Sequence, residues 1–431
     1  MAMPSSAQPD RPADIQRLYA AHADAAAYYR DQLTRHRGPA TYLHERGLGT
    51  VVERDAPWRI GYAPRAWTAL TDYLRSRGFS GAELVTAGLA RRGRDGRIFD
   101  VFRDRIVFPI RNRDGHTVAF TGRLWQTPTA TDAESPKYLN SPDSPIYAKS
   151  LELFGLYEQQ DRTGAGWPPV LVEGPADALA VWLSYPRTGG TGLVALAPCG
   201  TALTETQLAA AVALQGARRF GIAVAFDGDQ AGHKAAERAY ELLQAHPEII
   251  ARGAVFAPGA DPAQLLREPD GRARLRTTLG RRAQPLLHTV LDHRLGRMVQ
   301  RTPQLLHEIP GRLAVARVLA PMIAEQTPPA AVEALRHVGE TVEKLVDGRV
   351  DASEAVSATL RCIVLAVGDY LEAAPARPLS SRSAPGPPQP QRRHPAADGF
   401  PARLAPGTAS SATRSPVADV PTASPPRVRI R

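Results

Sequence analysis

Cysteine, lysine and long apolar stretches are scarce in this 431-residue chain. Two cysteines, Cys199 and Cys362, are too few for a disulfide framework or a cysteine-rich four-ligand zinc site. The eleven histidines show neither HxH nor HExxH spacing, so we expect no zinc. No apolar run approaches the ~20 residues of a membrane span, and the N-terminus lacks the basic start and apolar core of a secretory signal. We therefore expect a cytoplasmic protein that does not bind a membrane.

The positive charge is unevenly distributed. Of the formal net charge of +10, residues 375–431 carry +7, with nine arginines and two aspartates, which leaves +3 for the rest of the chain. These 57 residues also hold 13 prolines and have too little apolar content to form a core. We predict a disordered tail over 374–431 that attracts polyanions weakly. Nucleic-acid binding by the folded part must be inferred from the placement of individual residues.

The N-terminal third mixes helices with an antiparallel sheet. Apolar residues recur at helical spacing over 14–37, and 42–47 and 67–77 predict short helices. Between Ile98 and Trp125 the pattern changes to strands, two of them joined by Arg113-Asp114-Gly115, which is typical of a hairpin turn. Residues 1–13 are polar and predicted to be disordered, and 126–136 to be a polar loop.

From Pro169 onward strands and helices alternate. The pattern predicts strands at 170–173, 194–197, 220–229 and 253–258, with helices after Gly174, Thr204 and Gln230. Pro175 suits the first helical position, and Thr204 with Gln207 forms a capping box. This alternation predicts a mostly parallel sheet covered by helices. Residues 280–373 show helical periodicity without strand patterns and predict a helical subdomain.

Acidic residues follow the strands of the predicted parallel sheet, where such folds place their sites. Glu173 closes the first strand, Asp227 and Asp229 close the third, and Asp261 follows the fourth. Residues two apart in an extended segment point to the same side, so Asp227 and Asp229 can converge, and hard oxygen ligands suit Mg²⁺ or Mn²⁺. Three acids also have a purely structural interpretation in place of metal binding. Asp227-Gly228 can form a turn, Asp229 can cap a helix, and Asp177 can lie in the first turn of a helix, where it interacts with the helix dipole.

The motifs around these acids resemble those of DnaG-type bacterial DNA primases, whose metal-binding α/β module is called TOPRIM. The TOPRIM motifs are Val172–Asp177, Phe226–Gly232 and Gly259–Pro262. Upstream, in the family's order, stand Tyr42–Leu48, Ile60–Pro64, Phe99–Ile110, Ala119–Arg123, Pro136–Pro142, Lys149 and Leu153–Leu156. These upstream motifs favour a primase over other TOPRIM proteins.

The resemblance implies an α/β fold in several parts. We expect an α+β N-terminal primase-core subdomain at 14–165, a parallel-sheet TOPRIM domain at 166–272 and a helical subdomain at 273–373. It further implies a primase-type nucleotidyltransferase that makes short RNA primers from NTPs on a single-stranded DNA template, with a replicative helicase as a candidate partner.

Site residues are carried over from the family by position. Those expected to be catalytic are Glu173, Asp227 and Asp229, and those expected to bind Mg²⁺ or Mn²⁺ are Glu173, Asp177, Asp227, Asp229 and Asp261. Those expected to form a basic ridge that binds template and NTP are Arg105, Arg123, Lys137, Tyr138, Asn140 and Lys149.

The sequence departs from the family in three respects. There is no cysteine set for the zinc ribbon that usually precedes this core, and Ala263 stands where a second acid is expected after Asp261-Pro262. We also expect no helicase-binding domain after the helical segment. We therefore expect a primase of a plasmid, phage or integrative element. Two alternatives stay open: a catalytically weakened relic that binds single-stranded DNA at the replisome, and a TOPRIM nuclease.

Overall fold

The computed structural model describes residues 12–53, 55–126, 136–186, 190–200, 202–346, 348 and 350–373. The predicted loop at 126–136 and tail at 374–431 lie almost entirely outside these residues. Helix α1 begins at Pro12, inside the segment predicted to be disordered. None of the described helices is long and apolar enough to cross a membrane.

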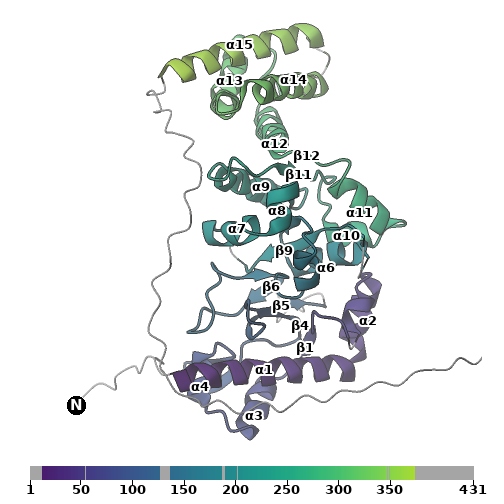
Figure 1. Cartoon of the computed structure of the whole chain (residues 1–431), viewed down its shortest axis with the longest axis vertical. Helices are drawn as coiled ribbons and strands as arrows, with labels where there is room; N and C mark the ends of the chain where they lie inside the picture. The colour runs from purple at the N-terminus through teal and green to yellow at the C-terminus, as the bar shows by residue number, and fades with distance from the viewer. Residues whose placement is uncertain are drawn as a thin grey trace, which may run out of the picture. The chain divides into compact units, whose positions relative to one another are not determined.

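The N-terminal part is built on a four-stranded antiparallel sheet in the order β1-β4-β5-β6. Its strands are β1 Gly61–Ala63, β4 Arg105–Arg111, β5 Thr117–Leu124 and β6 Tyr138–Asn140. The predicted hairpin is confirmed, because β4 and β5 pair antiparallel around Asp114-Gly115, and Gly115 has a positive φ of 85°. Helix α1 (Pro12–Arg35) contacts β1 and β5 and buries Leu18, Ala25 and Tyr29 there (Figure 1).

Smaller elements complete this part of the chain. They are α2 Arg37–Glu45, η1 Gly49–Val52, α3 Ala69–Ser76, α4 Gly81–Thr86, β2 Ala90–Arg92 and β3 Ile98–Asp100. Strands β2 and β3 form a separate two-stranded hairpin. The buried Asp100 carboxylate accepts hydrogen bonds from the backbone N–H groups of Leu70 and Thr71, both at 2.8 Å, and so fixes the start of α3.

The second part contains the predicted mostly parallel sheet. Its strands are β7 Leu153–Phe154, β8 Pro169–Val172, β9 Val194–Pro198, β10 Ile222–Ala225, β11 Ala251–Gly253 and β12 Gln284–Pro285. In the order β12-β11-β10-β8-β9-β7 the four central strands are parallel and the two edge strands are antiparallel. Because β9 and β10 lie on opposite sides of β8, the direction of winding reverses between β8 and β10.

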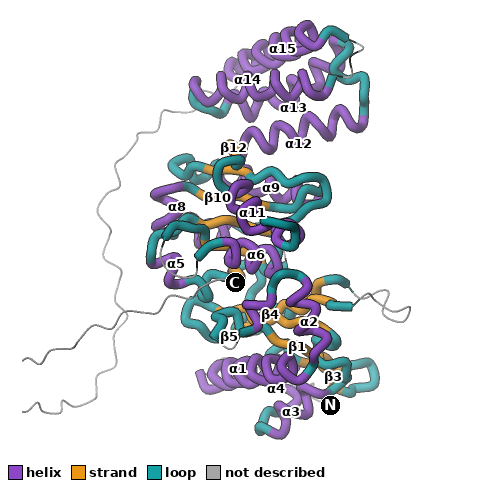
Figure 2. The backbone as a smooth tube through the Cα atoms, turned by 90° about the vertical axis from the view of Figure 1, so that its right-hand side faces the viewer, coloured by secondary structure: helices purple, strands orange, loops and turns teal. Residues whose placement is uncertain are grey.

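Helices cover both faces of this sheet (Figure 2). They are α5 Gln160–Gly164, α6 Pro175–Ser184, α7 Glu205–Val212, α8 Gln215–Phe220, α9 Gln230–Leu243, α10 Pro262–Leu266 and α11 Gly271–Leu279. Alternate strand residues supply two separate cores: Val170, Val172, Ala223 and Ala225 pack with α6, α10 and α11, whereas Leu171, Ile222 and Val224 pack with α7 and α9. The capping box of Thr204 and Gln207 is confirmed.

Two strand predictions were wrong in their extent. Residues 220–229 are not one strand, because Phe220 ends α8, Gly221 turns the chain with a φ of 86°, and β10 stops at Ala225. The strand expected at 253–258 is β11, which ends at Gly253. The acids therefore lie on loops and at helix starts beyond the strands.

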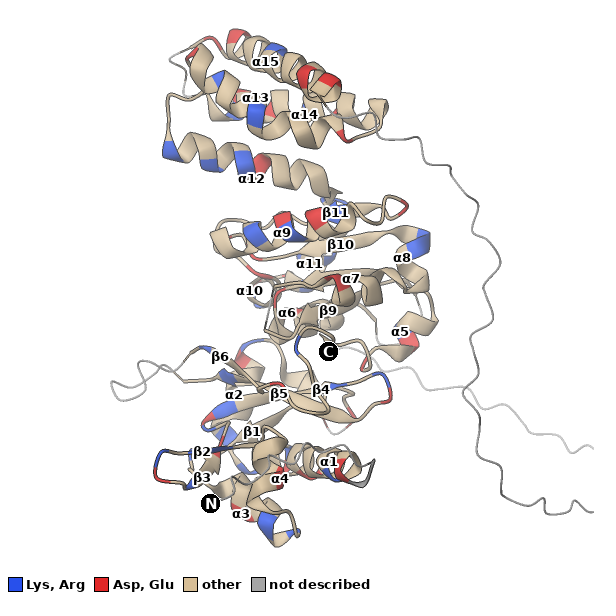
Figure 3. Ribbon diagram, turned by 90° about the vertical axis from the view of Figure 1, so that its left-hand side faces the viewer, with Lys and Arg blue, Asp and Glu red and all other residues tan. Residues whose placement is uncertain are grey.

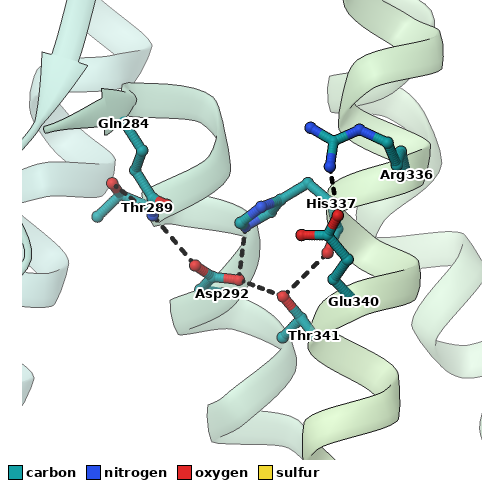
Figure 4. Close-up of polar contacts among 7 residues, drawn as sticks. All are labelled: Gln284, Thr289, Asp292, Arg336, His337, Glu340 and Thr341. Atoms are coloured by element: carbon teal, nitrogen blue, oxygen red, sulfur yellow. Dashed lines mark hydrogen bonds and ion pairs between the residues drawn. The ribbon is translucent and has the colours of Figure 1, made fainter. Parts of the chain in front are cut away.

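Four helices follow: α12 Leu286–Arg301, α13 Ile309–Ala324, α14 Pro328–Leu345 and α15 Ala352–Ala373. The helical prediction for 280–373 is confirmed except for the short β12. Between α12 and α14 the Asp292 carboxylate accepts hydrogen bonds from His337, Thr341 and Gln284 (Figure 4). Apolar side chains of the helices share the second core with α9, and the described residues group into one compact unit. The predicted boundaries at 165, 272 and 373 stay a prediction.

Candidate functional site

Strand β8 and helix α6 position the first two acids. The strand is fully buried and ends at Val172, Glu173 follows, and Gly174 caps α6 with Pro175 at its first position. Asp177 lies in the first turn of α6, where the helix dipole favours a negative charge. Its side chain is buried, and Oδ1 accepts a hydrogen bond of 3.2 Å from the backbone N–H of Ala263. Asp177 is one of the residues expected to bind the metal, and its carboxylate lies close to those of Asp227 and Asp261.

Asp227 and Asp229 differ in their surroundings. Asp229 is the N-cap of α9, and its Oδ1 accepts hydrogen bonds of 2.8 Å from the backbone N–H groups of Ala231 and Gly232. The cap considered from the sequence is therefore present. Asp227 has no such donor: within the described chain its buried Oδ1 has no hydrogen-bond partner. Its backbone N–H instead donates to Glu173 Oε1 at 3.0 Å.

Glycines let the acidic loops approach one another. A Cβ at Gly232 would lie 2.1 Å from the Asp227 carbonyl oxygen and 2.7 Å from Glu173 Oε1, so a side chain cannot fit there. The Gly228 N–H donates to the Ala260 carbonyl at 3.0 Å, and the Gly259 N–H donates to the Gly228 carbonyl at 3.0 Å. These two bonds hold the Asp227 loop against the loop that leads to Asp261, the N-cap of α10.

Three carboxylates converge as a result. One oxygen each from Asp177, Asp227 and Asp261 lie within 4.8 Å of one another. Burial, together with the neighbouring carboxylates, raises the pKa of Asp227 to about 8 and that of Asp177 to about 7. The unpartnered Asp227 oxygen and the mutual repulsion of the acids are both relieved by a divalent cation, and oxygen donors of this kind suit a hard ion. The site therefore fits divalent metal binding.

Glu173 is close to this group but does not belong to the three converging oxygens. It lines the same cavity, and burial raises its pKa against the lowering effect of the hydrogen bond from the Asp227 N–H. Ala263, in the position of the expected second acid, also lines the cavity. A carboxylate is therefore missing from the cavity wall itself.

Basic and polar side chains also line this cavity, which has a volume of about 300 Å³. Strands β5 and β6, with the residue before β6, contribute Arg123, Lys137, Tyr138 and Asn140, which we call the basic wall, to the lining that also contains Glu173 and the three aspartates. The Arg123 guanidinium donates a 2.8 Å hydrogen bond to the Tyr138 hydroxyl, and Thr121 donates one of 2.7 Å to Asn140 Oδ1. Four of the six residues predicted for the basic ridge thus line the same cavity as the acids.

The other two predicted ridge residues are placed differently. Arg105 is 4% exposed, and its guanidinium donates to the carbonyls of Gly122, Pro136 and Lys137. It holds β5 and the start of β6 together and does not line the cavity. Lys149 is half-buried and also absent from the cavity lining; its backbone hydrogen-bonds to Asp143 and Gln207. Their roles in binding stay predictions.

Sequence reasoning missed an exposed aromatic platform in the N-terminal part. Trp67 is 65% exposed, its ring meets that of Phe99 edge-on, and the Arg103 guanidinium lies 4.1 Å above its centroid. The adjoining β2–β3 hairpin exposes Arg91, Arg92, Arg94 and Arg97 (Figure 3). The sequence at 91–103 does mix basic and aromatic residues, but Trp67 joins them only in the fold.

Comparison with known proteins agrees with this architecture. The family model of the N-terminal domain of the DNA primase catalytic core matches residues 28–160, and a Toprim-like model matches residues 170–266. A DNA primase of Pseudomonas aeruginosa is 33% identical over 321 residues, which cover 73% of this chain and 44% of the relative. This chain thus spans less than half the length of the primases that it matches.

Solved structures give the same result. The RNA polymerase domain of the Mycobacterium tuberculosis primase DnaG superposes with a TM-score of 0.61 at 32% identity, covering 75% of this chain and 98% of that domain. A DnaG primase catalytic domain bound to single-stranded DNA superposes with a TM-score of 0.58 at 28% identity, covering 80% of this chain and all of that one. With its acids and its basic wall placed as described, the chain belongs to the family of DnaG-type bacterial DNA primases, whose catalytic core it contains.

Proposed function

We propose that this chain synthesises short RNA primers from NTPs on a single-stranded DNA template, as a primase-type DNA-directed RNA polymerase. The observation that carries the proposal is that one cavity is lined both by clustered carboxylates and by Arg123, Lys137, Tyr138 and Asn140. A bound triphosphate needs cations around its phosphates to neutralise their negative charge. The acids can supply them as bound metal, and the basic wall supplies them directly.

Asp177, Asp227 and Asp261 are the residues that would hold a divalent ion, which we take to be Mg²⁺ or Mn²⁺, with Glu173 beside them. When bound, such an ion neutralises phosphate charge and lowers the pKa of a coordinated hydroxyl. Asp227 offers its unpartnered oxygen, while the Ala263 N–H fixes the orientation of Asp177. Asp229 keeps the start of α9, and with it the Asp227 loop, in place.

The basic wall positions the substrate. Lys137 is exposed at the cavity and can meet a phosphate as a point charge, whereas Arg123 is buried and held by Tyr138, so its geometry is fixed before substrate binds. Asn140 uses its oxygen to accept from Thr121, which leaves its amide N–H groups to donate toward the cavity. This wall distinguishes a polymerase from a nuclease, which needs the acids but not four such residues in the same cavity.

We place the template on the Trp67 platform. An exposed indole stacked with a guanidinium can bind bases of any sequence, and the arginines of the β2–β3 hairpin can neutralise the backbone. A related DnaG catalytic domain is bound to single-stranded DNA, which supports single-stranded DNA as the template but not its position. A replicative helicase is a further proposed partner on the family resemblance alone.

Primer synthesis from labelled NTPs on single-stranded DNA, with Mg²⁺ or Mn²⁺, tests the proposal. We expect Asp227→Asn to reduce synthesis at least ~100-fold, beyond the cost typical of groups outside the metal's own ligands, while DNA binding persists. Asp270→Asn is the matched control, since Asp270 is exposed and its left-handed φ of 56° suits asparagine. Full synthesis by Asp227→Asn would contradict the assignment.

Ala263 favours one alternative, a weakened relic that binds single-stranded DNA without polymerising. In that case the wild-type chain would bind DNA at the Trp67 platform and yield no primers with either metal ion. A nuclease would instead shorten the template in the same reaction. The one assay, read for both products, separates the three functions.

A further inference from the structure

Helix α15 buries one face and leaves the opposite face without a partner in the described chain. Ala355, Thr359 and Ile363 recur every four residues and pack toward α13 and α14 (Figure 1). On the other side Val364, Leu365 and Leu371 are exposed by 52, 70 and 57%. A helix that already has a core face gains nothing within the chain from a second set of large apolar residues, so this set indicates an interaction surface.

A glycine lies within this exposed face. Gly368 is one helical turn beyond Leu365 and Val364, and a Cβ built on it would meet nothing within 4 Å. By contrast, a Cβ at Gly339 of α14 would lie 3.4 Å from Leu360 and Val356, so packing against α15 accounts for that glycine. Glycine inside a helix is destabilising relative to alanine, because it loses more conformational freedom on folding. At Gly368 nothing inside the chain offsets this cost, but a notch on an exposed face lets another helix approach closely.

Opposite charges flank the same face. Arg361 precedes the apolar residues by one turn and Glu372 follows them, both exposed. Among the described residues neither side chain has an ion-pair partner. The two are equally distant from the midpoint between Ala366 and Val367, and so are Leu365 and Gly368. When the helix sequence is reversed about this midpoint, Arg361 corresponds to Glu372 and Leu365 to Gly368, so this face of the helix is complementary to itself.

We propose that α15 pairs antiparallel with α15 of a second copy of this chain, about a two-fold axis through that midpoint. The arrangement sets Leu365 of each copy into the notch at the partner's Gly368, and Arg361 opposite the partner's Glu372. Because the axis repeats each contact, the interface contains two such packings and two such ion pairs. Val364 and Leu371 flank them and lose contact with water. A single pair of helices buries less than a standard interface, so the dimer forms at high rather than low protein concentration.

Analytical ultracentrifugation of the full chain over a wide concentration series tests the proposal. The wild type should shift from monomer to dimer as concentration rises. Leu365→Arg should weaken the dimer at least about tenfold, because it puts a charge against the partner's glycine notch and backbone. Leu365 makes up no part of the core, so circular dichroism and the melting temperature should be those of the wild type.

Charge reversal gives a sharper test. Arg361→Glu and Glu372→Arg should each weaken the dimer, since each creates two like-charged contacts, and the double variant should restore it in a salt-sensitive way. Arg317→Glu, on an exposed position of α13, is the matched control and should leave association unchanged. Three results would overturn the proposal: a wild type that stays monomeric at every concentration, as it would if its own tail covered α15; a dimer indifferent to Leu365→Arg; and a double variant no better than the single ones.

Discussion

The acidic cluster of the cavity and the Asp292 carboxylate of the helical part differ in how their charge is stabilised against burial. Asp292 accepts hydrogen bonds from His337 at 2.8 Å, Thr341 at 2.7 Å and Gln284 at 3.1 Å (Figure 4). Burial acts to raise its pKa, but these donors outweigh it and the pKa is lowered. In the cavity, Asp227 has a buried oxygen without a donor, and its pKa is raised to about 8. The chain thus provides Asp292 with donors of its own, whereas it leaves a buried Asp227 oxygen without a donor at a site that fits a divalent cation.

Removing the structural carboxylate should produce the largest change in stability. Asp292→Ala leaves His337, Thr341 and Gln284 without their acceptor between α12 and α14, and we expect a loss of about 1–3 kcal/mol in the free energy of unfolding. Glu343→Ala, an exposed position on α14, should stay within about 0.5 kcal/mol of wild type. Urea unfolding measures both. Equal stability of the two variants would show that the Asp292 bonds contribute nothing.

The location of both carboxylate groups shows what the sequence could and could not reveal. Motif order and the alternation of strands and helices located the acids of the cavity, because Glu173 and Asp227 directly follow parallel strands. Sequence could not show that Asp177 reaches Asp261, 84 positions later, since this depends on how α6 and α10 pack. The sequence pattern misjudged the 220–229 strand because Phe220 ends α8, Gly221 turns the chain and β10 stops at Ala225. The donors to Asp292 come from α14 and β12, which no local pattern joins to α12.

The two groups should also respond to pH with opposite signs. The folded pKa values of Asp227, about 8, and Asp177, about 7, exceed the unfolded value near 4, so the folded metal-free chain binds more protons. Its stability should therefore fall as pH rises from about 4 to 8. The lowered pKa of Asp292 adds stability that is present above the unfolded pKa and lost as pH falls through the folded one.

Thermal melts of the metal-free chain across this pH range measure the first effect. Saturating Mg²⁺ or Mn²⁺ should abolish the decline, whereas Asp227→Asn should only reduce it, because burial and Asp261 still raise the pKa of Asp177 in that variant. A decline of wild-type size in Asp227→Asn would mean that Asp227 does not contribute to it.

Introducing an acid at position 263 should change both the metal affinity of the cavity and the stability of the metal-free chain. Ala263 lines the cavity and its backbone already donates to Asp177, so Ala263→Asp adds a fourth carboxylate to the three that converge. We expect about a tenfold gain in affinity for the divalent ion and a lower melting temperature without it. Ala263→Asn, of the same shape but uncharged, is the control. Calorimetric titration that shows equal affinity for both variants would mean that position 263 does not face the ion.

The smallest expected effects concern the basic wall, where single charges meet phosphates. Lys137 lines the cavity, Lys149 does not, and Lys344 lies in the last turn of α14. Lys137→Ala should raise the half-saturating concentration of NTP or DNA several-fold and reduce the salt slope of binding by about one unit, since one phosphate contact is lost. Lys149→Ala should do less, in keeping with its place outside the cavity lining, and Lys344→Ala should do nothing.

All three remove one positive charge, so bulk charge alone predicts equal effects. Equal effects would therefore remove the reason to place NTP phosphates between this wall and the acids, whereas the expected order ties binding to the cavity and not to the net charge of the chain.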